Sequence, residues 1–468
     1  MKIIRLKHFT IICVFAISFA CLCGTIKAQE TISLTLDDSI KTALKNNPSL
    51  KSAEEKVKIA EQKANEARAS FMPSVSGSGT YTYLGVIPEI DFDPSSLLGG
   101  LMGGLPTQGA PSSNGSSGGG IPMGYEDNYN LGISIQQPLF TWGKIYNAYK
   151  QAKINLDAEK QGLEAVKQQI IFDTTKAFYG ALLTQELVKV TSMAVDQVKA
   201  HVKVAQDLVD AGMATNFDLL RAKVQLSNIQ SQFIKMQNMR ELAKDSFKLS
   251  VGISLDTQIE LDGNFIYKPI EPELDKLIEM AIKNRPEIKQ LELQEMMGEK
   301  IISLAKAGNK PNLALVYSDG VRSYADKFGD IFDKDEWERS WNITLALSVP
   351  IFDGFATKSR VKQAKSAVKQ IQIGKGQLID GITMEVRSSY MSLIEAKDLL
   401  NVQQETIQQA QESLRIANLQ YKNGMLTSVE LMDTELALTQ AQTNYTNALN
   451  DYVIAIAKLE KATASKLN

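Results

Sequence analysis

The sequence predicts a mainly α-helical protein with a transmembrane β-barrel part, made of two structural repeats that each contain two β-strands and long coiled-coil helices. Three observations lead to this class. The same motifs occur twice in the same order, four segments alternate apolar with polar residues, and two segments are free of proline over lengths that ordinary globular helices do not reach. The chain of 468 residues is long enough for such a duplication.

The duplication divides the chain into a first repeat at residues 29–250, an equatorial crossover at 251–273 and a second repeat at 274–468. Early motif pairs lie 238 residues apart and later pairs 212 apart. The difference indicates an insertion in the first copy, which we assign to a Gly/Ser-rich loop at 87–126, because such a composition cannot build a core. The matched motifs are Asn47-Pro48 with Arg285-Pro286, Pro73 with Pro311, Pro138-Leu139-Phe140 with Pro350-Ile351-Phe352, Gln151 with Gln363, and Gly212 with Gly424.

Four segments have the pattern of β-strands with one apolar and one polar face. In the clearest of them, Leu131, Ile133 and Ile135 alternate with glycine and polar residues. A tilted strand of ~9–11 residues crosses a bilayer, with apolar side chains toward lipid and polar side chains toward water. A soluble β-sandwich is the alternative, although four strands isolated among long helices fit it poorly. The expected strands are residues 74–86, 127–138, 312–322 and 340–350.

The helical segments are unusually long and need partners along their whole length. Residues 144–211 and 356–423 contain no proline, and each predicts a helix of about 100 Å. The segment that follows each of them carries apolar residues at three- and four-residue spacing. This pattern predicts two antiparallel coiled-coil hairpins, at residues 144–250 and 356–462. An ordinary helical bundle core would explain the same apolar stripes.

Each repeat also begins with a helix of about half that length, at residues 36–70 and 274–307. If this shorter helix is stacked end to end with the returning helix of the hairpin, the two together have the length of one full-length helix. Pro48 and Pro286 lie inside these segments and should kink the helices.

Four strands cannot close a barrel on their own. Open sheet edges carry unpaired backbone groups, which hydrocarbon does not tolerate. The chain should therefore share its barrel with copies of itself. Two copies would give eight strands with a filled interior, and three would give twelve strands with room for a lumen. The polar strand faces favour a wet lumen, so a trimer or a larger assembly is expected.

The first residues have the layout of a secretory signal peptide, which we assign to residues 1–28. Basic residues precede an apolar run at 11–22, and cleavage is expected between Ala28 and Gln29. A membrane anchor is the alternative, although the run is short of the ~20 residues that a spanning helix needs. Lipidation of Cys21 is a further alternative.

Composition argues against several kinds of chemistry. Cys13, Cys21 and Cys23 all lie in the signal region, so the mature chain has no thiol and no disulfide. His201 is the only histidine beyond it, which argues against histidine catalysis and zinc binding. No enzyme motif is present, no cofactor or metal is expected, and no basic cluster suggests nucleic acid. A hydrolase that uses only carboxylates remains as the enzymatic alternative.

The duplicated motifs together resemble the TolC family of outer-membrane efflux proteins. The resemblance covers essentially the whole mature chain. It rests on the Asn/Arg-Pro pairs, the strand ends before Gly143 and Gly354, and the turns at 212–218 and 424–430. It implies a TolC-like homotrimer, with a 12-stranded barrel in outer-membrane lipid and an α-helical barrel in the periplasm. Such a protein would be the passive exit duct of a tripartite efflux or type I secretion system, gated at its periplasmic tip.

The resemblance also implies partners. These are a periplasmic adaptor (a membrane fusion protein) and an inner-membrane pump of the RND, ABC or MFS type. The competing interpretation is that the chain is itself a periplasmic coiled-coil adaptor or structural protein. That interpretation explains the hairpins but not the four strands or the full-length duplication.

Functional residues are implied at the two hairpin tips. Glu430 and Asp433 match an acidic ring in the narrow bore, where three copies would place carboxylates that favour cations. Asp218 and Tyr421 match a latch that holds the tip closed, although Leu426 stands where the family has a basic latch residue. Acids at a helix N-terminus and a packing tyrosine are the alternatives. The candidate adaptor contacts, which could instead pack against each other, are Gly212, Met213, Ala214, Thr215, Gly424, Met425, Leu426 and Thr427.

Overall fold

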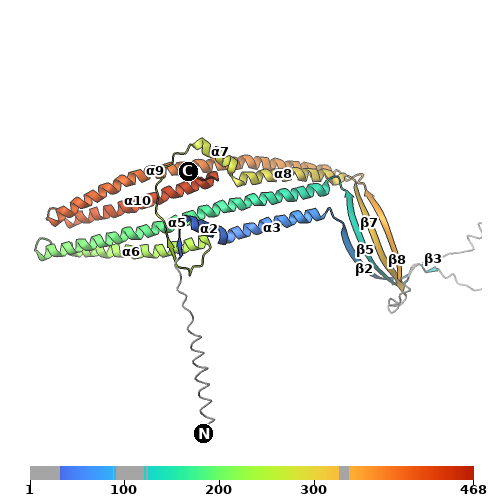
Figure 1. The fold of residues 1–468 in the computed structure, drawn as a ribbon, viewed down its shortest axis with the longest axis horizontal. Coiled ribbons are helices and arrows are strands. Elements are labelled where there is room, and N and C mark those ends of the chain that lie inside the picture. Colours follow the sequence, from blue (N-terminus) through green and yellow to red (C-terminus); the bar gives the residue numbers. More distant parts are fainter. Residues whose placement is uncertain (1–31, 88, 91–120, 123–124, 326–336, 468) are drawn as a thin grey trace, which may run out of the picture. The chain divides into compact units, whose positions relative to one another are not determined.

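The computed structural model describes residues 32–87, 89–90, 121–122, 125–325 and 337–467 (Figure 1). The expected signal peptide, its cleavage site at Ala28 and Gln29, and Cys21 lie outside the described residues, as does most of the expected loop at 87–126. The chain divides into two compact units. The hairpin unit holds the described residues up to 56 together with 160–290 and those from 375 onward, and the strand unit holds residues 57–159 and 291–374.

Helices and strands follow one another in the duplicated order that the sequence predicts. Within the described ranges, no helix combines the length and the apolar character that a membrane span requires. The first repeat contains β1 (Ile32–Leu34), α2 (Leu36–Asn46), α3 (Pro48–Ala69), β2 (Ser74–Tyr83), β3 (Glu89–Ile90), β4 (Ile121–Pro122), β5 (Asp127–Phe140), α5 (Lys144–Asp210) and α6 (Asn216–Val251). After β6 (Ile259–Leu261), the second contains α7 (Leu274–Asn284), α8 (Pro286–Lys306), a 3₁₀ turn (Ala307–Asn309), β7 (Asn312–Ala325), β8 (Trp337–Ser348), α9 (Ala356–Lys422) and α10 (Ser428–Thr463).

The hairpin unit contains two antiparallel helix pairs, in which α6 packs along the later part of α5 and α10 along the later part of α9 (Figure 1). The facing side chains are apolar at three- and four-residue spacing, such as Val195 and Val198 against Ile229 in the first pair. Each chain reversal uses a glycine in the left-handed region, Gly212 with φ of 70° and Gly424 with φ of 68°. Glycine adopts this conformation without the steric cost that a side chain brings.

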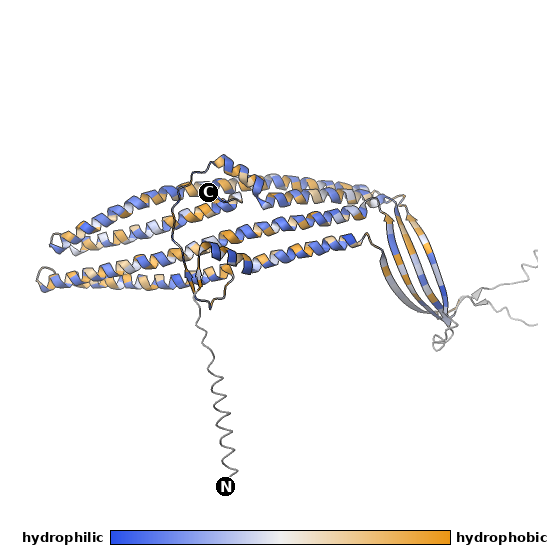
Figure 2. Cartoon of the chain, in the orientation of Figure 1, coloured by the Kyte–Doolittle hydropathy of each residue, from blue (hydrophilic) through white to orange (hydrophobic). Residues whose placement is uncertain are grey.

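The strand unit contains an antiparallel sheet of four strands in the order β2-β5-β7-β8. In one row across the sheet, Gly77 pairs with Ile133, Ile133 with Asp319, and Asp319 with Trp341. The apolar residues of β5 and β8 therefore share one face, and Figure 2 shows hydrophobic and hydrophilic residues alternating along the strands. Most apolar side chains of β8 are exposed in the single chain, including Ile343 at 62%.

An ion pair interrupts this apolar face, which the alternation pattern did not predict. Nη2 of Arg339 lies 2.6 Å from Oδ2 of Asp319, and Nε lies 3.0 Å from Oδ1. The two residues come from neighbouring strands, β8 and β7. The bidentate geometry lets each charge satisfy the other. The apolar face therefore carries a paired rather than an isolated charge.

The half-length helices break at their prolines, whereas the sequence predicted a kink. The chain leaves α2 at Asn47 and α7 at Arg285, where ψ is 125° and 121°, and new helices begin at Pro48 and Pro286. The reason is steric, because a proline pushes the residue before it out of the helical region.

The residue before each proline holds the end of the returning helix in its own repeat. Nδ2 of Asn47 donates a hydrogen bond to the carbonyl of Ser250 near the end of α6 (3.1 Å). Nη1 of Arg285 donates to the carbonyl of Ala462 near the end of α10 (3.4 Å), and Nη2 lies 3.0 Å from Oε2 of Glu385 on α9. Arg285 is buried. Its protein partners therefore take the place of water around the guanidinium group. In each repeat, the Asn/Arg-Pro motif thus connects the two helices that meet at the proline with the returning helix of the hairpin.

Arg285→Ala should lower the free energy of unfolding by about 2 kcal/mol, because it leaves helix-end carbonyls and the partly exposed Glu385 carboxylate without their buried partner. Thermal unfolding of the purified protein measures the change. Lys276→Ala is the matched control, since it removes one end of an exposed ion pair with Glu273 and should cost less than about 0.5 kcal/mol. Equal effects of the two substitutions would contradict the role of Arg285.

Candidate functional site at the hairpin tips

The two hairpin turns enclose a small cavity, here called the tip cavity. Its volume is about 190 Å³. The first hairpin contributes Leu208, Met213, Ala214 and Asp218, and the second contributes Tyr421, Gly424, Leu426, Thr427 and Ser428. The structure thus gathers the two predicted latch residues and five of the eight predicted adaptor contacts around one space.

Each returning helix starts with a capping box, a reciprocal pair of hydrogen bonds at the helix N-terminus. In α6 the Thr215 hydroxyl accepts from the backbone N–H of Asp218, whose carboxylate accepts from the backbone N–H of Thr215. In α10 Thr427 and Glu430 make the same exchange. The boxes satisfy backbone donors that a helix start leaves unpaired. They were not predicted, although Thr followed three residues later by Asp or Glu is a readable signal.

The predicted ring residues lie on the first turns of α10. Glu430 and Asp433 are both exposed. Hydrogen bonds from the backbone N–H of Thr427 and from its hydroxyl lower the pKa of the Glu430 carboxyl. Glu430 therefore keeps its negative charge into more acidic solution than an ordinary glutamate does. A single chain shows two neighbouring acids, and a ring requires further copies.

The predicted latch residues both line the tip cavity, but they are not hydrogen-bonded to each other. Both capping bonds of the Asp218 carboxylate use Oδ2. The Tyr421 side chain is 5% exposed, and within the described residues its hydroxyl has no hydrogen-bond partner. Burial raises the pKa of Tyr421. The adjacent Ser428 side chain opposes this rise, and the negative charges of Asp218 and Glu435 add to it. The phenol is therefore a neutral donor beside a carboxylate.

The predicted adaptor contacts differ in exposure. Met213 is 65% exposed and Met425 is 69% exposed. Ala214 and Leu426 are partly buried, and Leu426 packs against the apolar core of the second hairpin. Thr215 and Thr427 serve as the helix caps. Among the predicted adaptor contacts, the two methionines are therefore the large apolar side chains exposed to solvent.

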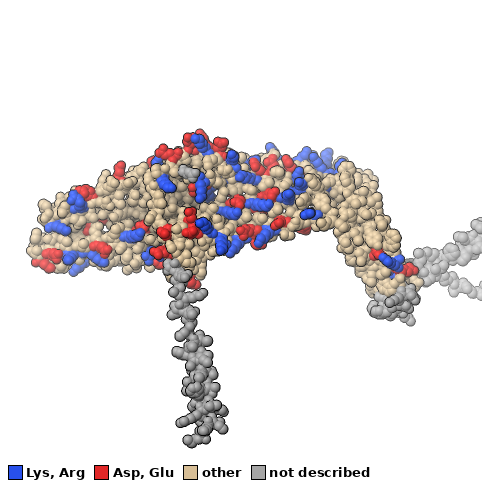
Figure 3. All heavy atoms as spheres, viewed as in Figure 1, with Lys and Arg blue, Asp and Glu red and all other residues tan. Residues whose placement is uncertain are grey.

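Charge elsewhere on the molecule is dispersed. On the face drawn in Figure 3, basic and acidic side chains are interspersed along the helices, while the strands carry few of them. In the described part of the chain, no group of three or more His, Cys, Asp or Glu side chains could hold a metal ion.

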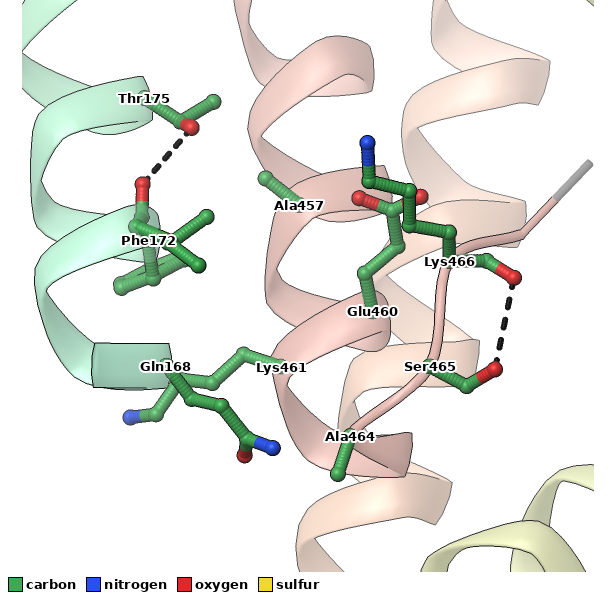
Figure 4. Close-up of a pocket in the computed structure, with 10 residues that line it drawn as sticks. Gln168, Phe172, Thr175, Ala457, Glu460, Lys461, Ala464, Ser465 and Lys466 are labelled. Carbon is green, nitrogen blue, oxygen red and sulfur yellow. Dashed lines mark hydrogen bonds between the residues drawn. The ribbon is translucent and has the colours of Figure 1, made fainter. Parts of the chain in front are cut away.

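A second cavity in the hairpin unit lies between α5 and the end of α10 (Figure 4). Its volume is about 180 Å³, and Gln168, Phe172, Lys461 and Ser465 are among its lining residues. Nζ of Lys461 lies 5.3 Å from the centre of the Phe172 ring, a cation–π distance. The dashed lines in Figure 4 mark hydrogen bonds to backbone carbonyls, from Thr175 to Ile171 and from Ser465 to Lys466. Its charged lining residues are Glu460, Lys461 and Lys466, and we assign the cavity no chemistry.

Comparison with known proteins gives a match on both sides of the crossover. The family model described as outer membrane efflux protein matches residues 100–252 and 277–465. Among curated relatives, the outer membrane protein TolC of Escherichia coli is 20% identical over 434 residues, which are 89% of this chain and 79% of that protein. The alkaline protease secretion protein AprF of Pseudomonas aeruginosa is 21% identical over 336 residues, or 71% of this chain and 69% of that protein.

Solved structures have the same fold. The outer membrane protein VceC of Vibrio cholerae superposes with a TM-score of 0.72 at 18% sequence identity, covering 92% of this chain and 97% of that chain. The predicted fold class, long helices combined with strands in two repeats, is confirmed by this likeness.

Proposed function

Because the chain belongs to the outer membrane efflux protein family, we propose that it is the exit duct of a tripartite efflux or type I secretion system. The family comprises transport channels of the outer membrane. The proposed duct is passive: it catalyses no reaction, and a partner pump supplies the energy. The periplasmic adaptor interpretation is not favoured, because the family match covers both repeats.

The observation that carries this proposal is the four-stranded sheet with two free edges. β2 and β8 each have one neighbour among the described strands. In hydrocarbon each backbone polar group needs a partner, so β8 of one copy would pair with β2 of the next until the ring closes. Alternating strand directions permit this pairing, since β2 and β8 run antiparallel to each other. Three copies would give a twelve-stranded barrel around a polar lumen.

Exposed apolar stripes on the helices support the same assembly. Phe217, Leu220 and Val224 on α6 are 69%, 60% and 60% exposed, and Met384 and Met391 on α9 are 68% and 61% exposed. Residues at this spacing share one face of a helix, and such a face is normally buried against another helix. Neighbouring copies would cover it and form the α-helical barrel in the periplasm.

The proposed partners are a periplasmic adaptor and an inner-membrane pump of the RND, ABC or MFS type. Met213 and Met425 are the proposed adaptor contacts, because methionine side chains adapt their shape to a partner and these two are exposed. The relative AprF is named for secretion of an alkaline protease, which supports the secretion branch of the proposal.

At the tip, the proposed gate has two parts. Glu430 and Asp433 of each copy would form the acidic ring. Asp218 and Tyr421 would form the latch, since Oδ1 of Asp218 is not used by the capping box and the Tyr421 hydroxyl can donate to it.

Glu430→Gln combined with Asp433→Asn should lower the cation-to-anion permeability ratio by about fivefold, if the ring contributes ~1 kcal/mol of electrostatic energy. Glutamine keeps the capping box, so the change removes charge and not the helix cap. Reversal potentials in a planar bilayer under a salt gradient measure the ratio. Because the pKa of Glu430 is lowered, the wild-type ring should hold this charge into more acidic solution than an ordinary glutamate would, and the ratio should fall only at lower pH.

The control for the ring is Glu412→Gln, which removes an exposed acid that pairs with Arg415 on α9. It should leave the reversal potential unchanged. An unchanged reversal potential in the double variant as well would remove the ring from the proposal.

Tyr421→Phe should raise the resting conductance roughly tenfold. It removes the hydrogen bond that Tyr421 would donate to Asp218 in the proposed latch, a bond to a charged acceptor that would contribute ~1.5 kcal/mol, and it keeps the packing of the ring. Thr215→Ala is the comparison, since it weakens the cap of α6 without altering Tyr421. Single-channel recordings without adaptor separate the two effects. A Tyr421→Phe channel that stays as closed as wild type would show that Asp218 and Tyr421 form no latch.

A further inference from the structure

His201 is the one histidine beyond the signal region, and it is buried inside the hairpin unit. It lies on α5, and its side chain is 1% exposed. Burial of an ionisable side chain is costly unless it finds partners. The proposed transport function assigns this residue no role.

Both ring nitrogens of His201 have a partner on α10. Nδ1 lies 3.2 Å from Oε2 of Glu435, and Nε2 lies 3.3 Å from Oγ of Ser428. Glu435 and Ser428 are buried as well, at 3% and 4% exposure. The ring of Tyr421 packs edge-on against the imidazole at 5.1 Å between centres. One side chain of the first hairpin is thus enclosed by the second.

This arrangement can satisfy His201 in either protonation state. A neutral imidazole donates from Nδ1 to the Glu435 carboxylate and accepts from the Ser428 hydroxyl at Nε2. A protonated imidazole donates from both nitrogens, and the hydroxyl turns to accept. Protonation therefore breaks no hydrogen bond, and it places a positive charge beside a buried carboxylate.

We propose that His201, Glu435 and Ser428 form a proton-dependent tie between the two hairpins, which holds the tip closed more firmly when His201 is charged. The proposal rests on the proposed function, since it concerns the opening of that duct. A charged donor strengthens the contact with Glu435, and loss of the charge leaves the carboxylate buried beside a neutral ring. Protonation of His201 therefore stabilises the tie, and loss of that proton weakens it.

The ionisable groups near His201 come from three helices. Glu435 of α10 is the nearest, and it is the acid that His201 contacts. The phenol of Tyr421 on α9 is held neutral by burial. Asp218 of α6 lines the tip cavity with Tyr421 and Ser428 and adds a second negative charge close by.

The test records the resting conductance of the purified channel without adaptor, in planar bilayers between about pH 6 and about pH 8, where histidine ordinarily titrates. The wild-type conductance should rise roughly fivefold over this range, the difference between a charged and a neutral hydrogen bond. His201→Gln and Glu435→Gln should each abolish this rise. Lys199→Gln is the control, because it removes an exposed charge from the same helix and should leave the pH profile unchanged.

A second measurement observes the histidine directly. Because the mature chain holds one histidine, protein labelled with ¹⁵N-histidine gives the signals of one imidazole. Its titration midpoint should move to lower pH in Glu435→Gln. An unmoved midpoint would overturn the charge pairing, even if a substitution prevents channel formation.

The two proposals can fail separately. Wild-type channels whose pH profile is the same as that of His201→Gln would overturn the tie and leave the duct intact. A wild-type protein that assembles but conducts under no condition would overturn the proposed duct function. The proposed role of the tie in gating would then fail as well.

Discussion

The unpaired backbone at the two edges of the strand sheet is the constraint on which the proposed assembly depends. β2 and β8 end the four-stranded order, and their outward N–H and C=O groups have no partner strand in the described chain. Water could satisfy these groups. The alternating apolar and polar faces, however, favour a position of the sheet in the lipid bilayer, where no water is available to the strand edges. Copies of the chain resolve this conflict by completing each other's edges. The exposed apolar faces of α6 and α9 would then be covered by the same neighbours.

In each repeat, residues of that repeat satisfy the backbone groups at the helix ends, and these interactions determine the conformation of the hairpin tip. The capping boxes begin the returning helices, left-handed glycines reverse the chain, and the residue before each proline holds the helix end. Asp218 and Glu430 occupy the same position of the two repeats, so both act as caps. Their proposed roles in the latch and the ring use the carboxylate oxygen that the capping box does not engage and the negative charge of the carboxylate. A carboxylate fixed by backbone donors is also well placed for recognition, because its orientation is set in advance.

Patterns with a short period could be read from the sequence, whereas contacts between distant residues could not. Alternation predicted the four strands, and the three- and four-residue spacing predicted both hairpins, since each reports one element and the face it buries. The capping boxes were readable but missed. The ion pair of Asp319 with Arg339 places two charges on the face that alternation marks as apolar. The contact of His201 with Glu435 joins residues 234 positions apart, and nothing local in the sequence indicates that a histidine and a glutamate so far apart share one buried site.

The native mass of the protein, extracted in detergent from outer membranes, tests the central claim most directly. The claim is that the sheet closes only when copies share their edges. Native mass spectrometry of the mature protein should give the mass of three chains, and the trimer should persist when the detergent is exchanged. A stable monomer from that membrane would leave the edges of β2 and β8 unpaired in lipid, and it would contradict the shared barrel.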